Sequence, residues 1–220
     1  MNKYIPFFTL LTISATVTAQ KAKGLNIIFI SADDLGYESL GYTGNSTPDI
    51  SPNIDRLASE SVQFHNAFVT ASVSQPSRSC WVTGRYPHRN GAVGFNPISN
   101  DELMLGREMR KAGYYTAIYE KANHYAPISP EHWDDCVPHV DGMGRDASAF
   151  EQLIVRGIKA AEKQHQPFFI MANCADPHRP FYGTPKDYKN VPKPSRIYTP
   201  KEVDVPGYLM DIPETRREFA

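Results

Sequence analysis

Two neighbouring carboxylates follow an apolar run near the start of the chain. Asp33 and Asp34 come directly after the run 26–30 and the dipeptide Ser31-Ala32. Adjacent carboxylates repel each other unless a cation shares them, and their oxygens are the ligands that a hard divalent ion prefers. The pair therefore has two interpretations: a metal site, or a turn or helix cap that binds nothing.

A serine and an arginine lie four residues apart in a second segment. It reads Ser-Gln-Pro-Ser-Arg from Ser74 to Arg78 and continues to Thr83-Gly84, where we expect a short helix to end. Pro76 stiffens the turn, and Arg78 places a fixed positive charge beside a hydroxyl. This arrangement suits a nucleophile held near a tetrahedral oxyanion, although the motif itself contains no base to activate the serine.

A lysine and two histidines follow later apolar runs. Lys121 and His124 come after the run 115–119, and His178 comes after the run 168–171 in an Asp-Pro-His sequence. Imidazole can transfer a proton near neutral pH. The position of His178 favours a role in a site, whereas His124 fits a site and a surface loop equally well.

Besides the short helix that ends at Thr83-Gly84, three strands and three helices are predicted to position these side chains. The apolar runs 26–30, 115–119 and 168–171 predict strands buried on both faces, and helices are expected at 51–58, 102–111 and 147–164. A serine cap and a proline at the first helical position begin the segment 51–58. Strands that alternate with helices predict an α/β fold with a largely parallel sheet, in which ligands bind beyond the carboxyl ends of the strands. The proline-rich segment 180–213 is expected to be a long surface loop.

The N-terminal residues and the composition limit the location and the partners. Residues 1–20 have a cationic start, an apolar stretch and a small-residue cleavage site, which predict a secretory signal peptide followed by one domain at 21–220. No later stretch is long and apolar enough for a membrane span. The 23 Lys+Arg against 24 Asp+Glu give a net charge of −1, which argues against a nucleic-acid partner.

Together, the segments resemble those of the type I sulfatases over about residues 25–185. The run Ser-x-Pro-Ser-Arg followed by Thr-Gly-Arg resembles the family's signature, whose first residue is oxidised to formylglycine. The segment 26–37 resembles the family's opening strand and metal-binding pair, and 52–58 resembles the helix that follows. The resemblance implies an alkaline-phosphatase-like sandwich with a mostly parallel central sheet.

The resemblance also implies roles for individual residues. Asp33, Asp34 and a modified Ser74 would bind Ca²⁺. One hydroxyl of the formylglycine hydrate attacks sulfur, and the second then expels inorganic sulfate. The metal and Arg78 would hold the sulfate oxygens, and Lys121 would neutralise the sulfate charge.

The two histidines would move protons in the same scheme. His178 would protonate the leaving amine or alcohol. The family's Gly-Lys-x-His sequence is replaced here by Glu-Lys-Ala-Asn-His at 120–124, one residue longer, so His124 is a base candidate at a shifted position.

Within the family, the segments 90–95 and 175–179 are most similar to the N-sulfoglucosamine sulfohydrolases, also called heparan N-sulfatases. This similarity implies a sulfated glycosaminoglycan oligosaccharide as substrate. The serine-type signature implies a formylglycine-generating maturation enzyme suited to an anaerobic bacterium. We therefore expect a protein that is secreted, periplasmic or on the outer surface.

One family element is missing from the sequence. The downstream Asp-Asn-Gly that supplies further metal ligands does not follow residue 185, so the domain is expected to be an incomplete amino-terminal portion with little or no turnover. Two alternatives stay open. The first is a phosphate or phosphonate ester hydrolase with unmodified Ser74. The second is a non-catalytic remnant that binds sulfated sugar through Arg78 and Lys121.

Overall fold

A four-stranded parallel sheet forms the centre of the molecule. The computed structural model describes residues 24–183 and 191–220, so the predicted signal peptide at 1–20 lies outside the described residues. The strands are β1 (Ile27–Ser31), β2 (Tyr115–Tyr119), β3 (Asp135–Val137) and β4 (Phe168–Asn173), in the order β1-β4-β2-β3. All three strand pairs are parallel, which confirms the predicted α/β class.

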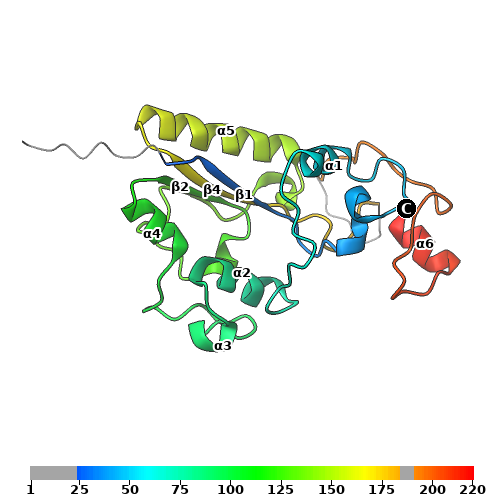
Figure 1. The fold of residues 1–220 in the computed structure, drawn as a ribbon, viewed down its shortest axis with the longest axis horizontal. Helices are drawn as coiled ribbons and strands as arrows, with labels where there is room; N and C mark the ends of the chain where they lie inside the picture. Colours follow the sequence, from blue (N-terminus) through cyan, green and yellow to red (C-terminus); the bar gives the residue numbers. More distant parts are fainter. Residues whose placement is uncertain (1–23, 184–190) are drawn as a thin grey trace, which may run out of the picture.

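Helices cover both faces of this sheet (Figure 1). The helix α5 (Ala147–Lys163) packs on one face, and α2 (Ser74–Thr83) and α4 (Leu105–Lys111) lie on the other. The remaining helices are α1 (Pro52–Ser59), α3 (Pro87–Asn90) and α6 (Pro213–Phe219). Short 3-10 turns span Tyr37–Ser39, Gly41–Thr43, Ala122–Tyr125 and Asp141–Gly144.

Alternating side chains of the two interior strands build a core on each face. Ile118 and Met171 belong to the cluster under α2 and α4, which also contains Trp133. Tyr119 and Ile170 belong to the cluster under α5. Every residue of β2 and β4 is buried, which confirms the burial predicted for these two strands.

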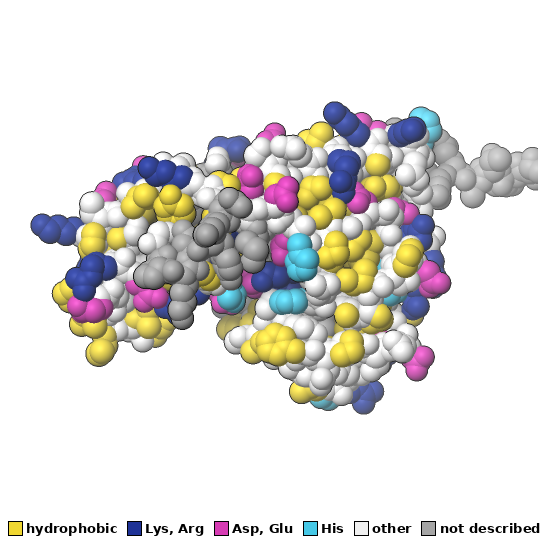
Figure 2. All heavy atoms as spheres, turned by 180° about the vertical axis from the view of Figure 1, so that it is seen from behind, with side chains coloured by type: hydrophobic (Ala, Val, Ile, Leu, Met, Phe, Trp, Pro, Cys, Tyr) yellow, Lys and Arg dark blue, Asp and Glu magenta, His cyan; other side chains and the backbone are white. Residues whose placement is uncertain are grey.

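The prediction that the first strand is buried on both faces is wrong. Ile27 is 37% exposed and Ile30 is 71% exposed. The reason is the position of β1 at the edge of the sheet, where β4 is its one partner within the described part of the chain. Figure 2 shows that hydrophobic side chains also form patches on one face of the molecule, with histidine, basic and acidic groups gathered between them.

The predicted helices are present with small differences. The helix α1 begins at Pro52 as expected, but Ser51 does not cap it through its side chain. Its hydroxyl instead accepts from the Gly41 backbone and donates to Asp55. The helix expected at 102–111 begins only at Leu105, and α2 ends at the left-handed Gly84 (φ +64°) as predicted.

Two parts of the fold had no clear pattern in the sequence. The strand β3 was not predicted, because its three residues are too short to show a period. The described residues of the proline-rich segment, 180–183 and 191–212, contain no helix or strand, and α6 then begins at Pro213, so the surface-loop prediction is confirmed there. None of the helices in the described ranges has the length and apolar character of a membrane-crossing segment.

Candidate active site

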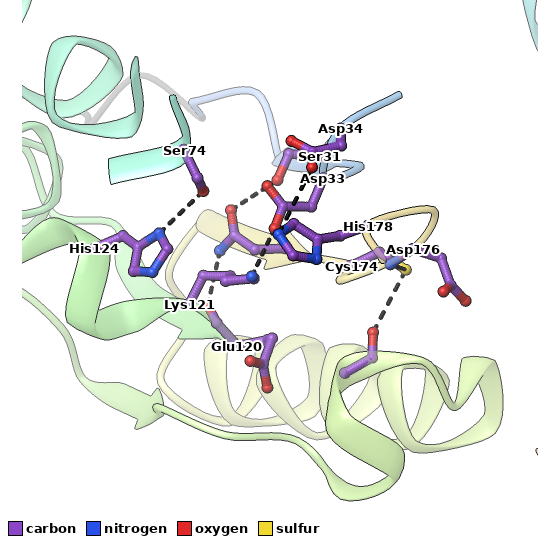
Figure 3. A network of polar contacts seen from close by, with 12 residues as sticks. Ser31, Asp33, Asp34, Ser74, Glu120, Lys121, His124, Cys174, Asp176 and His178 are labelled. Atoms are coloured by element: carbon purple, nitrogen blue, oxygen red, sulfur yellow. Dashed lines mark hydrogen bonds and ion pairs between the residues drawn. The ribbon is translucent and has the colours of Figure 1, made fainter. Parts of the chain in front are cut away.

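Polar side chains converge at the carboxyl ends of β1, β2 and β4 (Figure 3). Asp33 follows β1, Lys121 follows β2, and His178 follows β4. The first residue of α2, Ser74, faces them from a neighbouring element. The parallel arrangement of the strands thus brings together residues that are up to 145 positions apart, the separation of Asp33 and His178.

Ser74 lies between a cation and an imidazole. Its Oγ accepts a hydrogen bond from Nε of Arg78 at 2.9 Å and lies 3.0 Å from Nδ1 of His124. His124 belongs to the turn Ala122–Tyr125, which begins directly after Lys121. The structure thus brings His124 next to Ser74, and its role as a catalytic base stays a prediction.

The electrostatic surroundings keep His124 neutral. Burial, followed by the positive charges of Lys121 and Arg78, lowers the pKa of His124 from 6.5 to about 4. At neutral pH the ring therefore carries one proton and has a free nitrogen. In the tautomer whose free nitrogen faces Ser74, the ring accepts a hydrogen bond from the hydroxyl, so His124 is the candidate for the base that the serine motif lacks.

Arg78 is the buried centre of the site, with 1% of its surface exposed. Each of its side-chain nitrogens has an acceptor: Ser74 at Nε; Asp33 at Nη2; and Ser31, Tyr125 and Asn173 at Nη1. The guanidinium also lies over the ring of Trp81, 5.2 Å from its centre. A guanidinium held on all sides has a fixed position relative to Ser74.

Lys121 reaches the first of the two carboxylates. Its Nζ lies 2.6 Å from Oδ2 of Asp33, which is 3% exposed. Burial alone would raise the pKa of Asp33, but the hydrogen bond and charge of Lys121 and the charge of Arg78 hold that pKa below its ordinary value. Asp33 is therefore ionised and paired with two cations.

Asp34 and His178 lie at the rim of the site. The Asp34 side chain is 62% exposed, and its Oδ2 lies 3.6 Å from Nε2 of His178. Arg145 holds the loop that carries this histidine, because it pairs with Asp176 and donates to the backbone carbonyl of His178 at 2.6 Å. The two predicted site residues are thus next to each other and half-exposed, on the solvent side of Asp33.

The donor chemistry of this corner suits calcium in part. Two adjacent carboxylates end one strand, and a hydroxyl at Ser74 faces the same space, which are oxygen donors of the kind that calcium prefers. Within residues 24–183 and 191–220, however, no three His, Cys, Asp or Glu side chains gather as a metal cluster. The described residues therefore supply a partial set of the roughly six to eight oxygens that calcium takes.

A pocket of about 240 Å³ opens beside these groups. Its lining combines polar groups, namely both carboxylates, Ser74 and Arg78, with apolar side chains such as Val69 and Trp81. Trp81 is tilted against Phe29, 5.3 Å between ring centres. The pocket can therefore place an anionic group near Arg78 while the rest of a ligand contacts apolar side chains.

Four residues of the network were not predicted from the sequence. Ser31 and Asn173 are the last residues of their strands, so the polar end of an apolar run, which singled out Asp33, could have found them too. Tyr125 and Arg145 come from turns whose path depends on tertiary packing, and nothing in the local sequence marks them.

The fold and the site define an α/β protein of the alkaline-phosphatase-like class with a serine and two cations at its centre. The family model described as Sulfatase matches residues 25–203, so the chain belongs to the sulfatase family. This finding confirms the resemblance inferred from the motifs.

Two curated relatives show which members of the sulfatase family this chain is similar to. The chain is 26% identical to the N-acetylglucosamine-6-O-sulfatase of Bacteroides thetaiotaomicron, over 81% of this chain and 36% of the relative. It is 28% identical to the N-sulphoglucosamine sulphohydrolase of Homo sapiens, over 91% of this chain and 44% of the relative. The chain thus spans less than half the length of these relatives, and the predicted similarity to N-sulfoglucosamine sulfohydrolases is confirmed.

A solved structure similar to this chain also contains a sulfated glucosamine, the sugar named in both relatives. It was determined in complex with its substrate D-glucosamine-2-N,6-O-disulfate, is 26% identical, and superimposes with a TM-score of 0.60 over 71% of this chain and 35% of that one. The similar proteins therefore include one that binds a doubly sulfated glucosamine.

Proposed function

We propose that this chain carries the site of a sulfatase that hydrolyses sulfate esters or sulfamates of glycosaminoglycan-type sugars. The observation that supports this most is the position of Ser74. Its hydroxyl lies within hydrogen-bonding distance of both Arg78, at 2.9 Å, and the neutral His124, at 3.0 Å. A second cation, Lys121, forms an ion pair with Asp33 in the same site. A nucleophile, a base and two cations are the groups that sulfuryl transfer needs.

The residues of the chain divide the work between binding and proton transfer. Arg78 and Lys121 attract the sulfate oxygens, and the amino-terminal end of α2 adds positive potential at Ser74. His124 takes up the proton that the nucleophile releases. His178, half-exposed beside Asp34, would give a proton to a leaving amine or alcohol.

Two further features come with this proposal. Ser74 would be converted to formylglycine by a maturation enzyme, which supplies two hydroxyls on one carbon so that the bound sulfate can be expelled. Ca²⁺ would be held by Asp33, Asp34 and the side chain at position 74, and would supply positive charge to the sulfate oxygens. Both features rest on family membership and on the oxygen donors described above.

The substrate would be a glucosamine unit of a heparan-type oligosaccharide. Support comes from the two relatives and the solved complex, all three of which act on or bind glucosamine derivatives by name. Two substrates are candidates, glucosamine N-sulfate and glucosamine 6-O-sulfate. The same cations can hold either sulfate group. An exported location, periplasmic or on the surface of an anaerobic bacterium, is consistent with such a polymer as substrate.

Calorimetry with sulfated and desulfated sugars tests the proposal. We expect glucosamine N-sulfate or 6-O-sulfate to bind, desulfated glucosamine not to bind, and Lys121→Met to weaken binding at least about tenfold, since one of two cations is lost. Lys111→Met, which removes an exposed lysine of α4 that pairs with Glu108 and does not line the pocket, is the matched control and should bind as the original does. Equal binding of sulfated and desulfated sugar would refute the proposal.

We also propose that residues 1–220 alone turn over substrate poorly. The described residues offer two carboxylates for a metal, which leaves its coordination shell incomplete. Sulfate release should therefore be close to background with added Ca²⁺, while sugar binding persists. Calcium-dependent release of sulfate that disappears in Ser74→Ala would contradict this part of the proposal.

One observation favours a second candidate, an ester hydrolase that uses unmodified Ser74. The contact between Ser74 and a neutral His124 is also the arrangement of an activated serine. Such an enzyme would act on a phosphate or phosphonate ester. Cleavage of 4-nitrophenyl phosphate, with no cleavage of the corresponding sulfate, would favour this candidate over the sulfatase.

A further inference from the structure

A fully buried asparagine, Asn173, connects the part of the site around Arg78 with the turn that carries Lys121. Asn173 is the last residue of β4, which lies between β1 and β2 in the sheet, and none of its surface is exposed. It is paired in register with Ser31 at the end of β1. On the other side, its neighbour Ala172 is paired with Tyr119 at the end of β2. Asn173 thus lies between the strand ends that lead to Asp33 and to Lys121.

The amide oxygen of Asn173 faces the buried arginine. Its Oδ1 accepts from Nη1 of Arg78 at 2.8 Å, from the Tyr125 hydroxyl at 2.8 Å and from the Ser31 hydroxyl at 2.9 Å. Ser31 and Tyr125 are themselves acceptors for Nη1 of Arg78. The oxygen therefore fixes one edge of the guanidinium whose Nε binds Ser74.

The amide nitrogen of Asn173 faces the turn that carries the second cation. Its Nδ2 donates to the backbone carbonyls of Tyr119 and Glu120, both at 3.2 Å. At this turn two successive residues, Glu120 (φ +60°) and Lys121 (φ +57°), have left-handed backbone conformations. This conformation is unfavourable for residues other than glycine. This turn directs Lys121 to Asp33.

The polarity of the amide is set by these partners. Three donors surround the oxygen and two carbonyls face the nitrogen, so the reversed orientation would place like groups against each other on both sides. Among common side chains, a carboxylate lacks the donor and an aliphatic chain lacks both. The position therefore calls for a group that accepts on one side and donates on the other.

We propose that Asn173 is a positioning residue that fixes Arg78 and the turn of Lys121 relative to each other. It does not reach the pocket, since it is fully buried, and acts through the two cations. That these cations receive a sulfate group rests on the proposed function. The geometric claim itself concerns only the residues around Asn173.

Two substitutions test the acceptor and the donor of the Asn173 amide separately. Asn173→Ala removes both the acceptor and the donor. Asn173→Asp keeps the acceptor for Arg78 but places an oxygen against the carbonyls of Tyr119 and Glu120. The matched control is Asn90→Ala. Asn90 is also fully buried, and it bonds Ser79, Thr83, Arg85 and Ala92 on the side of α2 away from the site.

Hydrogen exchange measured by NMR gives a readout that does not depend on activity. In the original chain, the Nε–H of Arg78 should exchange at least about a hundredfold more slowly than that of a free arginine, because it is buried and bonded. Asn173→Ala should lose about tenfold or more of this protection, whereas Asn173→Asp and Asn90→Ala should keep it.

Exchange of a backbone amide reports on the stability of the turn that follows Lys121. The N–H of His124 donates to the carbonyl of Lys121 at 2.9 Å and closes the turn. Asn173→Asp should accelerate its exchange about tenfold, and Asn90→Ala should not. Should Asn173→Ala fail to fold, Asn173→Asp still tests the turn, and Tyr125→Phe, which removes one donor at the amide oxygen, should give a smaller loss of Arg78 protection.

Titration with inorganic sulfate then links positioning to binding. We expect sulfate affinity to fall at least about tenfold in both Asn173 variants and to be unchanged in Asn90→Ala. If exchange at Arg78 and His124 is the same in the Asn173 variants as in the control, the inference is wrong whatever the sulfate result. If exchange changes as expected but the original chain binds no sulfate, the positioning role holds and the proposed function fails.

Discussion

The unusual protonation of His124 is the clearest property of a single residue in this protein. Its folded-state pKa of about 4 lies below the ordinary value of 6.5, because the ring is buried near Lys121 and Arg78. The unfolded chain therefore binds a proton at a higher pH than the folded chain does. Between these two values acidification favours the unfolded state, so the free energy of unfolding should fall as the pH falls from about 6.5 to about 4.

This prediction can be checked by urea unfolding of the metal-free chain at several pH values. The variant His124→Gln has no titrating group at this position, so its stability should decline less between neutral pH and pH 4.5 than that of the original chain. An NMR titration should show the His124 ring neutral at pH 5.5. A ring that titrates with an ordinary histidine pKa would contradict the described environment.

The individual residues differ in how far the sequence could predict them. Asp33, Ser74 and Lys121 were predictable because each lies at the end or start of an element, and Arg78 because it shares the short motif of Ser74; the structure brings the four together. The sequence could not place His124, because its distance from Ser74 depends on how the turn after β2 folds back over α2. That these residues act as catalytic groups and metal ligands stays a prediction.

At the scale of elements, close contact between α5 and the sheet holds the site-bearing strands in place. Gly157 is buried at the middle of α5, and a Cβ atom added there would lie 2.7 Å from the hydroxyl of Tyr119 and 3.1 Å from Cδ1 of Ile170. The absence of a side chain lets the helix approach β2 and β4. Periodicity predicted the helix and both strands, but it could not predict this separation, which depends on the three elements together.

Replacement of this glycine should therefore destabilise the protein. Gly157→Ala gains up to about 1 kcal/mol of helix propensity, but overpacking costs typically about 1–3 kcal/mol, so we expect a net loss of about 1 kcal/mol in the free energy of unfolding. Gly207→Ala is the matched control, because nothing lies within 4 Å of its added Cβ. Equal stability of the two variants by urea unfolding would show that α5 can move away from the sheet at little cost.

At the scale of the whole molecule, the exposed edge strand is the main departure from the fold that the sequence predicted. The apolar run of β1 is typical of a strand inside a parallel sheet, yet Ile28 is 42% exposed and Ile30 is 71% exposed. A sequence pattern reports what a strand is suited to contact and cannot report which neighbours are present. An open edge with apolar side chains favours association with other chains.

We therefore expect the purified chain to self-associate with rising concentration, and Ile30→Lys to reduce this association. A charge at an exposed edge position opposes pairing and disturbs little of the core. Val155→Lys, at a 39% exposed position on α5, is the control for the added charge. Sedimentation velocity of the three proteins measures the effect. Association that is as strong in Ile30→Lys as in the control would show that β1 is not the contact surface.

The mass of the peptide that contains Ser74 tests the account most directly. The chain should be isolated from its own host, or produced together with a formylglycine-generating enzyme, and analysed by mass spectrometry. The account predicts a peptide lighter by two hydrogen atoms at Ser74, with no such change at Ser72 or Ser77. If the peptide from the native host always carries an unaltered serine at position 74, the proposed sulfatase chemistry is contradicted.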